Sequence, residues 1–145
     1  MLNVSCPNSL NQFNQFDLQR KKILMRFVME GCHFCVDSQP EWDSMIHTVK
    51  KRFKITPNTV ISQIDSAFSD EILSKHKIRA QDQTPYSING YPDYVVVMHG
   101  VATPHEKRDQ TSLIDALLSN KMIVPKQKSK RKRKQKQKRT KSVLI

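Results

Sequence analysis

The sequence between residues 23 and 35 reads Ile23-Leu24-Met25-Arg26-Phe27-Val28-Met29-Glu30-Gly31-Cys32-His33-Phe34-Cys35. Its apolar first half predicts a buried strand over Lys22–Met29. After the second cysteine, apolar side chains recur at helical spacing and predict a helix over Val36–Lys54, with Pro40 inside it. A helix places residues i and i+3 about 5–6 Å apart on one face, within the span that a disulfide tolerates. A strand, a Cys-x-x-Cys motif and then a helix therefore form a layout in which thiol chemistry has a physical reason to occur.

The two cysteines have three interpretations. Cys32 lies at the predicted start of the helix, where free backbone N–H groups and the macrodipole favour a thiolate, the attacking species. This favours a redox-active dithiol–disulfide couple formed by Cys32 and Cys35. The alternatives are two buried structural cysteines or a zinc site. Zinc needs four ligands, and the five histidines of the chain form no His-x-x-x-His pair.

Two later segments complete a pattern. Val60-Ile61-Ser62-Gln63-Ile64-Asp65 looks like a strand that ends in Asp, and Ile88-Asn89-Gly90-Tyr91-Pro92 precedes a predicted strand over Tyr94–Met98. With the Cys-x-x-Cys motif and Pro40, this order resembles the thioredoxin fold over roughly residues 18–122, and the protein disulfide isomerase-type domains in particular. The resemblance implies an α/β domain with a central mixed sheet flanked by helices.

The resemblance also implies an activity, that of a thiol–disulfide oxidoreductase on protein substrates. Cys32 is then the attacking cysteine, Cys35 resolves the mixed disulfide, and the two form a reversible Cys32–Cys35 disulfide. The bond between Tyr91 and Pro92 is expected to be cis, and these two residues shape a substrate groove that faces the cysteines. No dissociable cofactor and no metal are expected.

Several residues depart from the family pattern. A protonated His33 can favour the thiolate of its neighbour and make the disulfide more oxidising. The family usually has histidine second in the dipeptide, where Phe34 lies here, and an aromatic residue where this chain has Gly31.

The most serious departure is Arg26, at a position where the family usually has a buried Asp or Glu that relays the proton of the resolving cysteine. A guanidinium cannot act as a base. If it points at the thiols, it lowers their pKa; if it reaches solvent, it has no effect on them. Glu30 is an alternative proton acceptor.

The remaining elements follow from periodicity and turn residues. Residues 1–17 look like a weakly ordered lead-in with a free thiol at Cys6, although Phe13, Phe16 and Leu18 are compatible with a short helix on the core. We divide the chain into this lead-in, a domain over 18–124 and a tail over 125–145. The other predicted elements are strands over Thr59–Asp65 and Val101–Lys107, helices over Ser69–Lys77 (with Ser69 as N-cap) and Thr111–Asn120, and a polar loop over Arg79–Asn89.

The charge of the chain is concentrated in the tail. Lys126–Ser142 contains eleven of the 25 Lys and Arg residues and no acid, so of the net charge of +12 only about +1 belongs to the remaining residues. Such runs are usually disordered. We expect this tail, rather than the folded part, to carry any binding to nucleic acid or another polyanion. An anionic lipid surface, nuclear localisation or a purely solubilising role are the alternatives.

The sequence has no apolar run of the roughly 18 residues that a transmembrane helix needs, and residues 1–20 lack the features of a secretory signal. We therefore expect an intracellular protein, in the cytoplasm, in the nucleus or in a nucleic-acid-rich particle. We also expect a monomer. The rival to an enzyme is a redox-inactive binding module of the same fold, which the basic tail tethers to nucleic acid or to an acidic partner. Arg26, in place of the usual acid, keeps this rival open.

Overall fold

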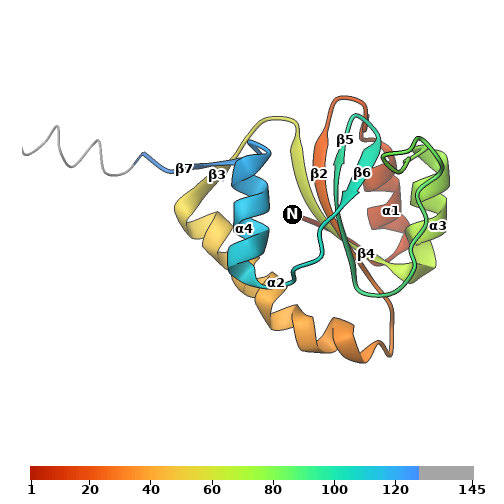
Figure 1. The fold of residues 1–145 in the computed structure, drawn as a ribbon, viewed down its shortest axis with the longest axis horizontal. Helices are drawn as coiled ribbons and strands as arrows, with labels where there is room; N and C mark the ends of the chain where they lie inside the picture. Colours follow the sequence, from red (N-terminus) through yellow and green to blue (C-terminus); the bar gives the residue numbers. More distant parts are fainter. Residues whose placement is uncertain (128–145) are drawn as a thin grey trace, which may run out of the picture.

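The strand predicted from the apolar run becomes the centre of a mixed five-stranded sheet in the computed structural model, which describes residues 1–127 (Figure 1). The strand order is β1-β4-β2-β5-β6, and a separate pair of strands, β3 and β7, lies at one end. The elements are β1 (Leu2–Val4), α1 (Pro7–Asn14), β2 (Lys22–Val28), α2 (His33–Arg52), β3 (Phe53–Ile55), β4 (Thr59–Asp65), α3 (Ser66–Lys75), β5 (Asp93–Met98), β6 (Val101–Pro104), α4 (Gln110–Ser119) and β7 (Ile123–Pro125). β2 pairs in parallel with β4 and antiparallel with β5.

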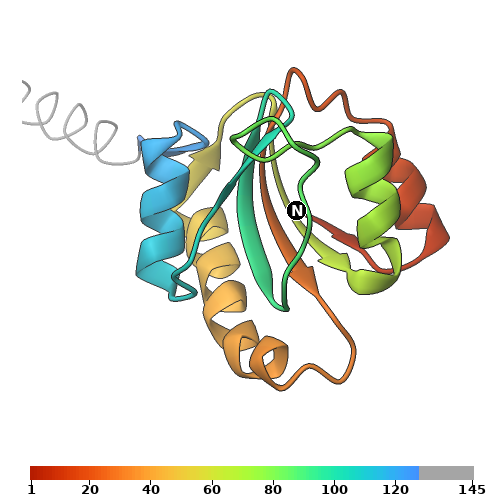
Figure 2. The same ribbon diagram turned by 45° about the vertical axis from the view of Figure 1, so that its right-hand side comes forward.

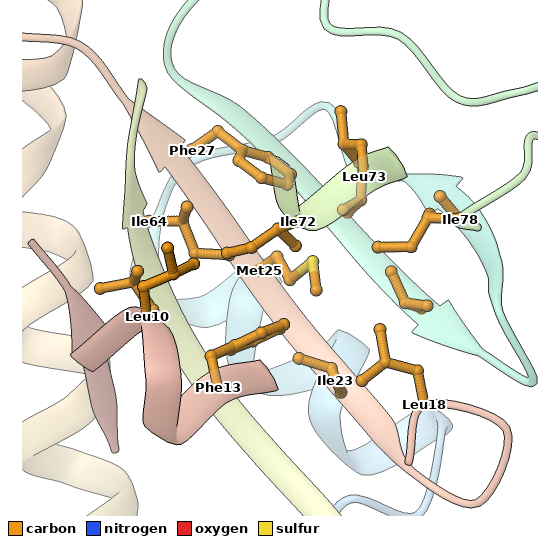
Figure 3. Close-up of a cluster of buried hydrophobic side chains, with 14 residues drawn as sticks. Leu10, Phe13, Leu18, Ile23, Met25, Phe27, Ile64, Ile72, Leu73 and Ile78 are labelled. Atoms are coloured by element: carbon orange, nitrogen blue, oxygen red, sulfur yellow. The ribbon is translucent and has the colours of Figure 1, made fainter. Parts of the chain in front are cut away.

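Helices cover both faces of this sheet, which explains why β2 is apolar along its length rather than alternating. α1 and α3 lie on one face, and α2 and α4 lie on the other (Figure 2). Ile23, Met25 and Phe27 of β2 point to the α1/α3 face, where the side chains of both helices enclose them (Figure 3). Leu24 and Arg26 point to the α2/α4 face. Burying each large apolar side chain stabilises the fold by about 1.5–3 kcal/mol.

The strands over residues 22–28 and 59–65 match the sequence prediction closely, but the starts of α2 and α3 do not. α2 begins at His33, three residues before the predicted start, so that Cys32 is its N-cap. α3 begins at Ser66, and the predicted cap Ser69 is wrong. Asp65 caps this helix instead, because its carboxylate accepts the backbone N–H of Ala67 at 2.9 Å.

The N-terminal residues are a second correction. Residues 1–17 are not a weakly ordered lead-in, because they contain β1 and α1. Phe13 is fully buried, and its ring meets those of Phe16 and His76 edge to face. Cys6 is an exposed free thiol, as expected, but it is not on a loose segment, since it is the N-cap of α1 and contacts Ser9.

The C-terminal boundary also differs. Phe53 and Lys54, predicted as helix, begin the strand β3, which pairs antiparallel with β7. Pro125 and Lys126, predicted as tail, are therefore held by the fold, and the backbone N–H of Lys126 donates to the carbonyl of Arg52 at 3.0 Å. From residue 128 onward the predicted tail lies outside the described residues. Over residues 1–127 we find no helix that combines the length and the apolar character needed to cross a membrane.

Candidate dithiol site

Cys32 and Cys35 lie at the first turn of α2, just after the loop that follows β2. The Sγ atom of Cys32 accepts the backbone N–H of Cys35 at 3.1 Å. Both residues are free cysteines and both are buried, with exposed fractions of 8% and 6%. A helix N-terminus stabilises negative charge on a capping atom. The sulfur of Cys32 therefore lies at the positive end of the α2 dipole. Exposure does not distinguish the two thiols.

The surroundings of the second thiol, that of Cys35, disfavour its ionisation. Burial raises the pKa of Cys35, and its hydrogen bond with Cys32 raises it further. A backbone hydrogen bond at Met29 and the positive charge of Arg26 lower this pKa by less, so its direction remains upward. At neutral pH Cys35 is thus a thiol that must lose a proton before it can act as a nucleophile.

The segment before β5 lies against the first thiol. The Tyr91–Pro92 peptide bond is cis, as the resemblance implies. The thiol of Cys32 donates to the carbonyl oxygen of Tyr91 at 3.4 Å. Residues from two distant parts of the sequence therefore meet at the sulfur of Cys32.

Arg26 lies directly beneath this turn and is fully buried. It reaches neither solvent nor a thiol, so it takes neither of the two positions that the sequence left open. All five of its N–H donors are used, and every acceptor is neutral. The acceptors are the hydroxyl of Tyr94 (2.9 Å), the side-chain carbonyls of Gln39 and Gln63 (both 2.7 Å), the main-chain carbonyl of Cys35 (2.8 Å) and the hydroxyl of Ser38 (2.9 Å).

This network connects α2 to the sheet. Arg26 and Tyr94 are directly opposite each other on β2 and β5, and Arg26 is opposite Gln63 on β4. The guanidinium also lies 5.9 Å from the ring centre of Trp42 and 5.6 Å from that of Tyr94. Arg26 thus anchors the Cys35 carbonyl to three strands, and its charge is buried without a carboxylate among the residues that it contacts.

The residues around the motif are exposed. His33 does not turn toward Cys32, because its Nε2 atom lies 3.0 Å from a carboxylate oxygen of Asp37, one turn along the helix. The side chain of Phe34 is 61% exposed. Gly31 has a φ of 75°, in the left-handed region that favours glycine, which gives a backbone reason for the absence of an aromatic side chain there.

Solved structures share the fold of this chain. The J-Trx1 fragment of ERdj5 matches with a TM-score of 0.55 and 16% identity, over 82% of this chain and 50% of that one. The chain has the thioredoxin fold. The first thioredoxin domain of mouse Protein disulfide-isomerase A4 matches at a TM-score of 0.52 with 19% identity, over 81% of this chain and 72% of that one. For the Trx4 domain of ERdj5 the TM-score is 0.52 and the identity 16%, over 83% and 93% of the two chains. This chain spans half the length of the first ERdj5 fragment. No protein-family model and no curated protein sequence matches it.

Within this thioredoxin fold, a cavity of about 390 Å³ lies beside Cys35. Glu30, Gln39 and Asp65 also line it. Glu30 was expected from the sequence as a proton acceptor, whereas Asp65 was not. The parallel register offered a signal, because Asp65 lies opposite Val28 at the end of β2, beside the loop that leads to Cys32.

Sequence reasoning also missed the partners of Arg26. Ser38 and Gln39 lie three and four residues after Cys35 and so face the same side of α2, which is a usable signal. The contribution of Tyr94 and Gln63 depends on strand register, which only the sheet supplies. Over residues 1–127 no three His, Cys, Asp or Glu side chains gather in a way that could hold a metal ion.

Proposed function

We propose that this thioredoxin-fold chain is a thiol–disulfide oxidoreductase that acts on protein disulfides. One observation carries the proposal: the sulfur of Cys32 caps α2 within hydrogen-bond distance of both Cys35 and the main chain beside Pro92. A nucleophile, a resolving thiol and the main chain beside Pro92 thus meet at one point. No separate cofactor is needed for the exchange, since the two thiols carry the electrons.

The reaction has two balanced steps. The Cys32 thiolate attacks one sulfur of a substrate disulfide, a new S–S bond forms, and the other substrate sulfur leaves as a thiolate that takes up a proton. Cys35 then loses its proton and attacks the Cys32 sulfur, which releases the second substrate thiol. The substrate gains two electrons, the Cys32–Cys35 pair loses two, and the same steps run backward in an oxidation.

The fate of the Cys35 proton is the point at which Arg26 matters. The guanidinium keeps its protons and cannot accept another. The carboxylates that share the cavity with Cys35 are those of Glu30 and Asp65. We assign proton acceptance during resolution to Glu30, because the Asp65 carboxylate already accepts the N–H of Ala67. Arg26 is a positioning residue that holds the Cys35 carbonyl.

Apolar side chains around the motif favour a protein as substrate. Met29, Phe34 and Val36 are among the most exposed large apolar residues of residues 1–127, at 45%, 61% and 69%. All three lie within four residues of Cys32 in the sequence. A peptide strand can cover such side chains while the carbonyl of Tyr91 lies beside its disulfide.

Trapping of mixed disulfides tests the proposal. Cys35→Ser should accumulate a covalent adduct with a disulfide-containing protein such as insulin, because Cys32 can attack but nothing resolves the product. Cys32→Ser should accumulate none, and Cys6→Ser is the matched control that should behave like the wild type. Equal trapping by the two motif variants would overturn the assigned roles. No adduct and no insulin reduction by the wild type would instead favour the redox-inactive binding module.

A further inference from the structure

The end of α2 lies beside β3, β7 and the end of α4 (Figure 1). The chain segments that meet there carry six exposed basic residues. We call this set the basic pole; it consists of Lys50, Lys51, Arg52, Lys54, Lys121 and Lys126. They come from α2, β3, the turn after α4 and the residue after β7. The chain segments that form the pole, 44–64 and 116–127, contain no Asp or Glu.

Backbone contacts hold these segments together, so the clustering does not depend on where flexible side chains happen to lie. β3 pairs with β7, which places Lys54 opposite Val124. The Nζ atom of Lys126 donates to the carbonyl of Lys50 at 2.8 Å. The hydroxyl of Thr56 donates to the carbonyl of Lys121 at 2.9 Å and brings the end of α4 to the end of β3.

The near-neutral total of the folded part conceals a separation of charge. Residues 1–125 contain fourteen Lys and Arg and thirteen Asp and Glu. Five of the fourteen belong to the basic pole, so the rest of this part has nine basic against thirteen acidic residues. The domain is therefore net negative away from the pole and strongly positive at it.

Helix dipoles account for only part of this pattern. α2 and α4 both end here, and each C-terminus carries the equivalent of about half a negative charge, which favours nearby cations. The two termini together amount to about one negative charge against six positive side chains. Lys54 and Lys126, moreover, lie on or beside strands. The excess positive charge destabilises this end by self-repulsion unless an anion neutralises it.

The pole also marks where the described chain ends. Residues 1–127 finish beside Arg52, and the sequence continues with ten further Lys and Arg up to residue 142, without an acid or an aromatic residue. α2 has twenty residues and is therefore about 30 Å long, with Cys32 at its opposite end. An anion at the pole leaves the dithiol site uncovered.

We propose that the basic pole binds the phosphate backbone of nucleic acid without regard to base sequence. A phosphate backbone supplies negative charge at regular spacing over the length that this many cations require. No aromatic residue lies in 126–142, which removes base stacking and favours contacts to phosphate alone. Residues 126–142 contain no apolar residue that could insert into a lipid surface, and the sequence then ends with the three apolar residues Val143-Leu144-Ile145. This inference does not depend on the thiol chemistry.

The test compares two full-length variants that each lose three charges. Lys51→Gln/Arg52→Gln/Lys54→Gln removes half of the pole, and Lys75→Gln/Lys77→Gln/Lys107→Gln removes three exposed lysines elsewhere in the fold. Binding to a fluorescein-labelled 20-base-pair DNA duplex is followed by anisotropy from 50 to 300 mM NaCl. Thermal melting verifies that both variants are folded, which is expected because the altered side chains are exposed.

Each phosphate contact contributes a slope of about −0.9 to log K against log salt, so the pole variant should lose about 2–3 units of slope while the control keeps the wild-type value. Scrambling the duplex sequence should change neither. Equal slopes for the two variants would overturn the role of the pole and leave the tail as the sole site. Absence of duplex binding by the wild type at 50 mM salt, or tighter binding to phosphatidylserine-containing vesicles than to the duplex, would overturn the choice of nucleic acid.

Discussion

Replacement of Arg26 by lysine should destabilise the protein although it conserves the charge. The guanidinium uses five N–H donors on five neutral acceptors, whereas an ammonium has three. At least two acceptors then lose their donor. A buried acceptor left without a partner costs about 1–3 kcal/mol. Gln39 and Gln63 are only half-buried and already share a hydrogen bond of 3.2 Å. Loss of the Arg26 donor at these two acceptors should therefore cost an amount at the low end of this range.

We therefore expect the free energy of unfolding of Arg26→Lys to fall by about 2–4 kcal/mol. For a domain of this size that corresponds to a decrease in Tm of about 8–16 °C. Urea unfolding gives the first quantity and calorimetry the second. Arg20→Lys is the control, because Arg20 is 85% exposed and its one ion pair, with Asp17, is long at 3.6 Å. If Arg26→Lys loses no more stability than Arg20→Lys, the network does not hold the helix to the sheet.

Three further predictions concern titratable groups. Burial and the hydrogen bond with Cys32 raise the pKa of Cys35 above its ordinary 9.0. The rate of mixed-disulfide resolution, measured by stopped flow, should therefore rise about tenfold per pH unit from pH 7 to pH 9. A plateau of this rate below pH 8 would contradict the prediction. Glu30→Gln should slow the resolution step at pH 7 and leave the attack step unchanged. The control Asp37→Asn alters only the exposed pair with His33 and should slow neither step. Equal effects of the two variants would count against Glu30 as the proton acceptor. Burial also raises the pKa of Asp93 above its ordinary 3.8, so the folded state disfavours this carboxylate and stability declines as pH rises through that range. Asp93→Asn keeps an acceptor for the Tyr86 hydroxyl. Its urea midpoint should therefore be close to that of the wild type at pH 3 and higher than that of the wild type at pH 7. The same difference in midpoint at both pH values would refute the reasoning.

The sequence was informative wherever burial is two-sided or a motif has fixed spacing. β2 is an apolar run and β4 is rich in β-branched residues, and the predicted bounds of both strands agree with the structure to within one residue. The Cys-x-x-Cys motif and Pro40 inside the helix that follows it could likewise be placed from the sequence, and the resemblance to the thioredoxin fold implied the cis Tyr91–Pro92 bond.

What could not be predicted depends on partners that are distant in the chain. β1 has three residues, and it is a strand only because β4 offers it a hydrogen-bonding neighbour. β3 and β7 define each other in the same way. Arg26 was visible as an anomaly, but its role was not, because two of its five acceptors, Tyr94 and Gln63, are placed opposite it only by strand register. A buried cation without a carboxylate has no signature in a single sequence.

The first strand has a protective consequence. Residues Leu2–Val4 pair with Ser62–Ile64, and the Ser62 hydroxyl adds a bond of 2.7 Å to the carbonyl of Leu2. Without them, β4 would present a row of unsatisfied amides along the rim of the sheet, and strands from other molecules add readily to such a row. These three residues thus cover the edge of β4 and protect the domain from self-association. An affinity tag or a deletion that displaces these residues would expose the edge of β4 and promote aggregation, while the dithiol site stays intact.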